Sequence, residues 1–262
     1  MSSQSLEQVK RTWDGRAKDP QLKGAYVTMR DRNQRLLEID EALRYVPAGQ
    51  RVLDVGCGNG FSTAVFARQA EHVVGIDFSE AMIERAQREY GDITNITFEV
   101  RDILSPLPFP EKSFGVAIAQ RCLINLVSWE NQQVAIENIA RVIRPGGHFV
   151  MQEGTLQGRE TLNQLREQVG LSRIPPVPYN TDFDETLLWG FLRHHFEIVH
   201  VRRYGLYDLV ARVAHPMLVA PAEPNYEAKI NDVARRLAAA NDTAGELSRW
   251  FTAFLRVRPS SA

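Results

Sequence analysis

RVLDVGCGNG, at residues 51–60, is an apolar run that ends in an acid and continues with glycines at alternate positions, Gly56, Gly58 and Gly60. The run predicts a buried β-strand. The glycines predict a tight turn whose backbone N–H groups approach a ligand at the start of a helix. In an open parallel sheet, ligands bind beyond the carboxyl ends of the strands. This stretch therefore predicts an α/β sheet with a ligand site at the turn.

From residue 51 to residue 153, short apolar runs alternate with amphipathic helical stretches. This alternation is typical of βαβ units around a parallel sheet. Ser79 and Ser128 are each followed by an acid and are predicted to cap helices. Pro145, Gly146 and Gly147 are predicted to end the second of these helices.

The segments outside this alternation predict helical additions to the core. Two amphipathic helices within 1–50 are expected to form an N-terminal lid. Residues 51–204 and 251–262 are expected to form the core, with a helix and loop inserted at 154–190. Residues 205–250 hold an apolar stripe at helical spacing, which predicts a helical substrate cap before the last strand. The stripe consists of Tyr226, Ile230, Val233 and Leu237.

Composition narrows the class of protein. The chain has 262 residues, 31 Lys and Arg against 32 Asp and Glu, and 44% hydrophobic residues, so it can bury a full core without a strong net field. A nucleic-acid partner is therefore disfavoured. Two cysteines, Cys57 and Cys122, are too few for a disulfide framework or a zinc site, and no apolar run reaches about 20 residues. We expect a cytoplasmic protein without a membrane partner, either a monomer or a homodimer.

The glycine spacing separates two kinds of nucleotide ligand. A dinucleotide loop has the spacing G-x-G-x-x-G, but here the third glycine comes one residue early and Phe61 takes its place. Asp54 adds a negative charge where a diphosphate would approach. The same charge suits a ligand that carries an ammonium or a sulfonium. A nicotinamide oxidoreductase is therefore an alternative that the spacing disfavours.

Two further strand ends carry side chains suited to a nucleoside. Asp77 ends the next strand, 21 residues after Gly56, at the position that binds ribose hydroxyls in this architecture. Phe78 offers an apolar wall for a purine. Asp102 ends a third strand and can accept from an exocyclic amine, while Ile103 can cover a ring face. Together these strand ends predict a site for a nucleoside with an attached cation.

The sequence resembles the class I S-adenosylmethionine-dependent methyltransferases. The resemblance covers roughly residues 45–153 and rests on VLDVGCGNG, GIDFS, RDILSPLPF with FGVAIA, and RVIRPGGHFVMQE. It implies a Rossmann-like sheet of seven strands, mostly parallel, with helices on both faces and the last strand antiparallel. It also implies S-adenosylmethionine as the cofactor and S-adenosylhomocysteine as the product.

The resemblance assigns cofactor contacts residue by residue. Near the methionine part it implies Asp54, Gly56, Gly58 and Gln120; at the ribose, Asp77; at the adenine, Phe78, Asp102 and Ile103. Arg30 is a further candidate, as a partner for the methionine carboxylate.

Residues beyond the cofactor are assigned by their place at the same edge of the sheet. Glu153 and His215 are the candidate general bases, with a capping or salt-bridging role as the alternative. The candidates for acceptor binding are Arg121, Asn125, Tyr204 and Tyr207. The fourth strand end carries no acid for magnesium, so we expect no metal. It also lacks the N/D-P-P-Y/F motif with which methyltransferases of amides and exocyclic amines hold a planar nitrogen.

The expected function is methyl transfer to a small polar metabolite. A weak likeness of GRETLNQLREQVGL and PYNTDF to methyltransferases of sugars and natural products favours O-methylation of such an acceptor. N- or C-methylation, and a protein that only binds or senses S-adenosylmethionine, remain alternatives. Positioning is expected to dominate catalysis, because orienting the reactants contributes about 7 to 11 kcal/mol.

Overall fold

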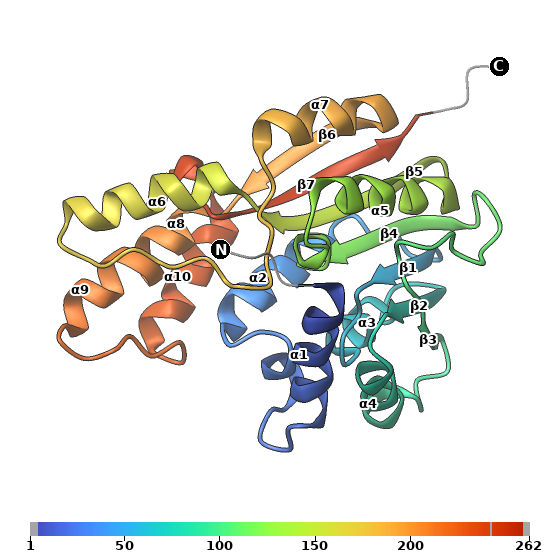
Figure 1. The fold of residues 1–262 in the computed structure, drawn as a ribbon, viewed down its shortest axis with the longest axis horizontal. Coiled ribbons are helices and arrows are strands. Elements are labelled where there is room, and N and C mark those ends of the chain that lie inside the picture. Colours follow the sequence, from blue (N-terminus) through green and yellow to red (C-terminus); the bar gives the residue numbers. More distant parts are fainter. Residues whose placement is uncertain (1–4, 242, 259–262) are drawn as a thin grey trace.

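A computed structural model of the chain describes residues 5–241 and 243–258. Its single sheet has the strand order β3-β2-β1-β4-β5-β7-β6, in which β7 is antiparallel to both of its neighbours and the other pairings are parallel (Figure 1). The predicted seven-stranded, mostly parallel sheet is confirmed. The strands are β1 (Arg51–Val55), β2 (His72–Asp77), β3 (Ile96–Val100), β4 (Phe114–Gln120), β5 (Ile143–Gly154), β6 (Phe196–Arg203) and β7 (Trp250–Val257).

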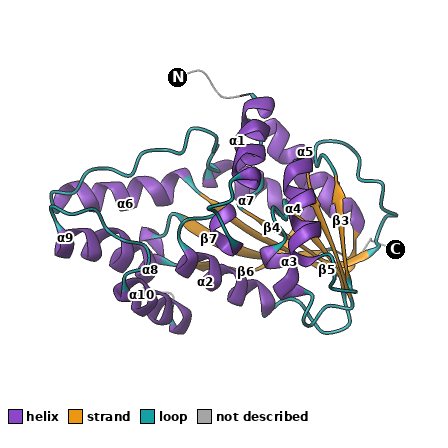
Figure 2. Cartoon of the chain, turned by 90° about the horizontal axis from the view of Figure 1, so that it is seen from below, coloured by secondary structure: helices purple, strands orange, loops and turns teal. Residues whose placement is uncertain are grey.

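Helices surround the strands in both views (Figures 1 and 2). Ser79 and Ser128 cap their helices as predicted, since their side chains accept from the backbone N–H of Met82 and Asn131. The α-helices are α1 (Leu6–Lys18), α2 (Arg32–Leu43), α3 (Phe61–Phe66), α4 (Glu80–Tyr90), α5 (Trp129–Val142), α6 (Leu156–Gln168), α7 (Glu185–His195), α8 (Gly205–Asp208), α9 (His215–Val219) and α10 (Lys229–Ala240). The shorter turns are η1 (Gly24–Val27), η2 (Leu123–Asn125), the π-helical η3 (Leu209–Ala214) and η4 (Gly245–Leu247).

The Pro-Gly-Gly segment at 145–147 does not itself end a helix. Helix α5 already ends at Val142, and β5 begins at Ile143, so the segment lies within β5. The buried Ile143 pairs with Phe114 of β4, and the register shifts before His148 resumes the ladder. The contact between Ile143 and Phe114 therefore starts β5 before the glycines, earlier than the glycines alone predict.

Two hydrophobic layers cover the two faces of the sheet. On one face, Ile136 and Ile139 of α5 and Leu188 and Leu192 of α7 pack with the strands. On the other face, the contacts come from α2 and α3. The carboxyl ends of the parallel strands are left for a ligand site between these layers.

Helices α6, α8, α9 and α10 gather at one end of the molecule in both views (Figures 1 and 2). The segment with the apolar stripe does contain a helix, α10, but the stripe is not its packed face. Tyr226 precedes the helix, and the side chains of Val233 and Leu237 are 44% and 46% exposed. Instead α10 packs Ala234 and Ala238 into a cluster with Leu37 of α2 and Tyr204 and Tyr207, because small side chains allow a close approach.

In the described part of the chain, no helix combines the length and the apolar character needed to cross a membrane.

Candidate active site

The glycine turn between β1 and α3 is packed on both sides by other parts of the chain. Gly56, Gly58 and Gly60 have φ angles of 68°, 55° and 79°, which glycine adopts far more readily than other residues. A Cβ on Gly56 would collide with Cys122, and a Cβ on Gly58 would lie 2.6 Å from Cγ2 of Thr28. The close neighbours that forbid side chains here are therefore parts of the chain itself.

Asp77 at the end of β2 connects the glycine turn to the next helix. One carboxylate oxygen accepts from the N–H of Gly58 at 3.0 Å, and the other accepts from the N–H of Ser79 at 2.9 Å. Burial raises the pKa of Asp77 to about 6, while these two N–H donors act to lower it. Each carboxylate oxygen has a second lone pair, so Asp77 can still accept from a ligand diol.

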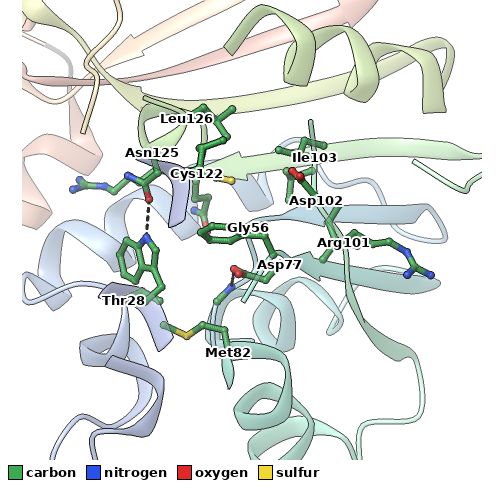
Figure 3. A pocket seen from close by; sticks show the side chains of 18 of the residues that line it. Thr28, Gly56, Asp77, Met82, Arg101, Asp102, Ile103, Cys122, Asn125 and Leu126 are labelled. Carbon is green, nitrogen blue, oxygen red and sulfur yellow. Dashed lines mark hydrogen bonds between the residues drawn. The ribbon is translucent and has the colours of Figure 1, made fainter. Parts of the chain in front are cut away.

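A first cavity of about 960 Å³, part of it open to solvent, lies over these strand ends (Figure 3). It is lined at one side by Asp77, Asp102 and Ile103 and at the other by Cys122 and Asn125 (Figure 3). The walls include seven of the nine residues that the sequence assigns to the cofactor. They are Gly56, Gly58, Asp77, Phe78, Asp102, Ile103 and Gln120.

The N-terminal segment contributes residues to the wall of this cavity. Leu6 and Trp13 of α1 and Thr28 and Met29 after η1 line it. The indole Nε1 of Trp13 donates to Oδ1 of Asn125 at 3.1 Å, which ties α1 to the loop after β4 (Figure 3). The N-terminal segment thereby forms part of the wall at the carboxyl ends of the strands.

Three residues that line the first cavity have a buried polar atom without a partner within the described residues: Arg35, Gln120 and Arg101, the last of which pairs with Glu99 through another nitrogen. The guanidinium of Arg35 on α2 is 5% exposed and makes no hydrogen bond with described residues, and its Nε is buried. The buried Oε1 of Gln120 also lacks a partner there, while its amide nitrogen donates to Gln152. An unpaired cation and an unpaired acceptor complement the carboxylate and the ammonium of an amino acid. The residues present therefore fit a nucleoside joined to methionine.

Asp54 and Arg30 lie outside the first cavity. Asp54 is 2% exposed and accepts from Oγ1 of Thr63 at 2.6 Å, and burial raises its pKa to about 6. Asp54 therefore supports the glycine turn from the side away from the cavity. The positive charge of Arg35 acts to lower the pKa of Asp54. Arg30 lines a second cavity, whereas Arg35 lines the first, where a methionine carboxylate is expected.

The second cavity, of about 970 Å³, is open to solvent and adjoins the first. Two predicted acceptor residues, Arg121 and Asn125, line both cavities. Arg121 has a φ of 54° and pairs with Glu38, and its guanidinium carbon lies 3.5 Å from the ring centre of Trp250. The five residues shared by both cavities are Trp13, Thr28, Met29, Arg121 and Asn125.

Glu153 does not line either cavity. It is fully buried, and its carboxylate accepts from the backbone N–H groups of Cys122, Leu123 and Ile124 at 3.1, 2.9 and 3.3 Å. Burial raises its pKa to about 8, while the three N–H donors favour the charged form. These bonds support the capping alternative, since Glu153 holds the turn that presents Asn125 to the site.

The other residues predicted from the cap are also buried away from both cavities. His215 is 3% exposed at the start of α9. The hydroxyl of Tyr204 pairs with Thr252. The hydroxyl of Tyr207 donates to Asp31 at 2.6 Å, and Asp31 lines the second cavity. The cap thus reaches the second cavity through Arg212 and Tyr226 instead.

Sequence patterns did not indicate several cavity residues. Arg35 belongs to a polar face of α2, with Gln34, Glu38 and Glu41, that looks solvated in the sequence but is buried. The second cavity combines side chains from distant segments, among them Arg16, Tyr179 and Trp250. No local spacing indicates that these residues meet. Within the described residues, no group of three or more His, Cys, Asp and Glu side chains could hold a metal ion.

Known proteins with similar sequences and structures define the family. Residues 52–147 match the family described as "Methyltransferase domain". The O-methyltransferase rstn1 of Aspergillus nomiae is 33% identical over 67% of this chain and 75% of its own length. The demethylmenaquinone methyltransferase of Tropheryma whipplei is 41% identical over 41% of this chain, and this chain spans 43% of that protein.

A solved structure supports the same fold. The N-methyltransferase NodS of Bradyrhizobium japonicum, in complex with S-adenosylhomocysteine, superposes with a TM-score of 0.60 at 14% identity, over 96% of this chain and 99% of that one. The chain belongs to the class I S-adenosylmethionine-dependent methyltransferases. Its cofactor is accordingly S-adenosylmethionine.

Proposed function

We propose that this protein transfers the methyl group of S-adenosylmethionine to a small polar acceptor held in the second cavity. The observation that carries this proposal is the shared wall, in which Trp13, Thr28, Met29, Arg121 and Asn125 contact both cavities. A cofactor whose amino-acid end is at Arg35 and Gln120 and whose nucleoside is at Asp77 has its sulfonium between them. The shared wall is where the acceptor would meet it.

Positioning supplies the catalytic effect in this proposal. The cofactor brings a methyl group already activated by a positive sulfur. The protein's residues orient the acceptor and exclude water, which contributes about 7 to 11 kcal/mol. Among the described residues that line either cavity there is no histidine or glutamate. The carboxylate of Asp31 is bound by Tyr207 and Arg212, which lower its pKa, so it is a poor base.

We further propose that the transfer is O-methylation of a sugar or another natural product. The name of rstn1, an O-methyltransferase of which this chain spans 75%, supports an oxygen acceptor. N- and C-methylation are the alternatives at the same site. The free thiols of Cys57 and Cys122 fit a cytoplasmic protein.

The test combines the protein, methyl-labelled S-adenosylmethionine and a panel of hydroxylated glycans, phenols and polyketide-like metabolites, with mass spectrometry of the products. We expect label to appear on an oxygen of at least one acceptor and not in reactions with Asp77→Ala. Label on nitrogen or carbon would select the alternative chemistry. Tight cofactor binding with no transfer to any acceptor or host extract would instead favour a protein that only binds or senses the cofactor.

A further inference from the structure

We propose that the second cavity binds an anionic acceptor, whose carboxylate or phosphate group is held by Arg16 and Arg30. This inference rests on the proposed function, since it names the class of acceptor that the same site takes.

The walls of the second cavity carry an excess of positive charge. Among the described residues, five arginines line it and only one carboxylate, that of Asp31. Three of the arginines already have acidic partners. Arg121 pairs with Glu38, Arg212 with Asp31, and Arg249 with Asp208.

The remaining two arginines, Arg16 and Arg30, have no carboxylate within 4 Å among residues 5–241 and 243–258. Arg16 is half-buried, and its guanidinium donates to the carbonyl oxygens of Val27 at 2.7 Å and Tyr26 at 2.9 Å. These bonds orient the guanidinium but leave its charge uncompensated. Burial lowers the pKa of Arg16, and the positive charge of Arg30 lowers it further. The two guanidinium groups therefore repel each other electrostatically.

Arg16 and Arg30, which lack a carboxylate partner in the described part of the chain, repel each other, and an anion bound between them would relieve the repulsion. Two groups act on Arg16 in the opposite direction and raise its pKa: Tyr179, which lines the cavity, and Asp19, which does not. A cationic acceptor would add to the repulsion, and a neutral one would leave it in place. An oxyanion can instead accept N–H bonds from both guanidinium groups.

Aromatic side chains surround these charges. Trp13 and Tyr179 meet edge to face at 5.6 Å, and the guanidinium carbon of Arg16 lies 5.9 Å from the ring centre of Trp13. Across the cavity, Tyr226 lies under Arg212, and Trp250 lies under Arg121. Apolar ring faces suit the body of an acceptor that carries its charge at one end.

The test measures binding separately from turnover, on protein saturated with S-adenosylhomocysteine. Ligand-observed NMR titrations use two matched pairs of probes, 4-hydroxybenzoate with 4-hydroxybenzamide and phenyl phosphate with phenol. We expect the charged member of at least one pair to bind about 10-fold more tightly or better, because a hydrogen bond to a charged group contributes about 1.5 to 3 kcal/mol. The stronger of the two anions identifies the group as carboxylate or phosphate.

Variants locate the anion site. Arg30→Glu changes an exposed side chain and should weaken binding of the anion about 10- to 100-fold, and Arg16→Gln should do the same if the protein folds. Arg32→Glu is the matched control, because this exposed arginine lines neither cavity. Equal affinity for charged and neutral probes, or equal loss in Arg30→Glu and Arg32→Glu, would overturn the proposal. Anion binding without methyl transfer would count against the proposed function alone.

Discussion

The two cavities of this protein are built in different ways. The first cavity is formed by the ends of neighbouring strands. The turn after β1, Asp77 at the end of β2 and Gln120 at the end of β4 lie side by side there. The second is formed by side chains from α1, from the loop after η1, from the loop before α7 and from the cap. The cofactor side is thus set by the sheet, whereas the acceptor side is set by how the added segments pack on it.

The charges on the two sides differ as well. The first cavity is backed by buried carboxyl groups, and burial raises the pKa of both Asp54 and Asp77 to about 6. The second cavity is lined by arginines. The first cavity is also lined by Arg35, Arg101 and Arg121, but it includes the carboxylates of Asp77 and Asp102. We propose a sulfonium nucleoside for the first cavity and an anion for the second. Four predictions test this difference.

The largest effect is expected at Asp77. Asp77→Ala removes the acceptor for two ribose hydroxyls, and two charge-assisted hydrogen bonds amount to about 3 to 6 kcal/mol. Calorimetry should therefore show S-adenosylhomocysteine binding at least about 100-fold more weakly. Asp92→Ala, an exposed acid outside both cavities, should bind as the wild type does. Near-normal affinity in Asp77→Ala would place the ribose elsewhere.

Asp54 is expected to make stability depend on pH. Burial raises its pKa from 3.8 to about 6, so the folded state holds this proton more tightly than the unfolded chain. The resulting stabilisation is present below pH 4 and is lost as the pH rises through 6. It amounts to about 3 kcal/mol, at 1.36 kcal/mol for each pKa unit.

Urea unfolding of the wild type and of Asp54→Asn at pH 4, 5, 6 and 7 measures this contribution. The free energy of unfolding of the wild type should fall by about 3 kcal/mol relative to that of the variant over this range. Asp92→Asn serves as the exposed control. Parallel curves for the wild type and Asp54→Asn would mean that Asp54 titrates normally.

Arg35 should distinguish the two ends of the cofactor. Arg35→Gln removes the cation expected to hold the methionine carboxylate, so S-adenosylhomocysteine should bind about 10- to 100-fold more weakly. Methylthioadenosine, which lacks the amino-acid end, should keep its affinity within about twofold. Arg32→Gln is the control for the change in charge. If both ligands weaken equally, Arg35 supports the fold of the cavity and does not contact the carboxylate.

The smallest effect is expected at Asn180, which lines only the second cavity. Its Oδ1 accepts from Nδ2 of Asn125 at 2.9 Å. Asn180→Ala loses one neutral hydrogen bond, about 0.5 to 1.5 kcal/mol, so the KM for an acceptor from the panel should rise about 2- to 10-fold. Affinity for S-adenosylhomocysteine should not change. An equal effect on both ligands would show that the two cavities respond as one.

The cofactor side was largely predictable because its signals are local. The alternation from residue 51 to residue 153 predicted the sheet, and seven of nine assigned residues line the first cavity. Asp54 does not line this cavity, and a strand end does not reveal which face its side chain takes. Arg35 was missed because a buried polar helix face has the same pattern as a solvated one.

The acceptor side was less predictable because its signals are not local. The stripe Tyr226, Val233 and Leu237 indicated a helical segment, but the packed face of α10 consists of Ala234 and Ala238, and the stripe is exposed. Glu153 lay at the right edge of the sheet, yet the turn of η2 requires its carboxylate as a cap. Helical spacing does not specify which face finds a partner.

By itself, the sequence determined the sheet, its glycine turn and the place of Asp77 at the strand end beside that turn, because backbone conformation and strand periodicity act between near neighbours in the chain. Only the tertiary structure decided which arginines keep an uncompensated charge. Arg16 and Arg30 differ from Arg212 and Arg249 in their distance from Asp31 and Asp208, and that distance is set by the packing of α1, α2 and the cap.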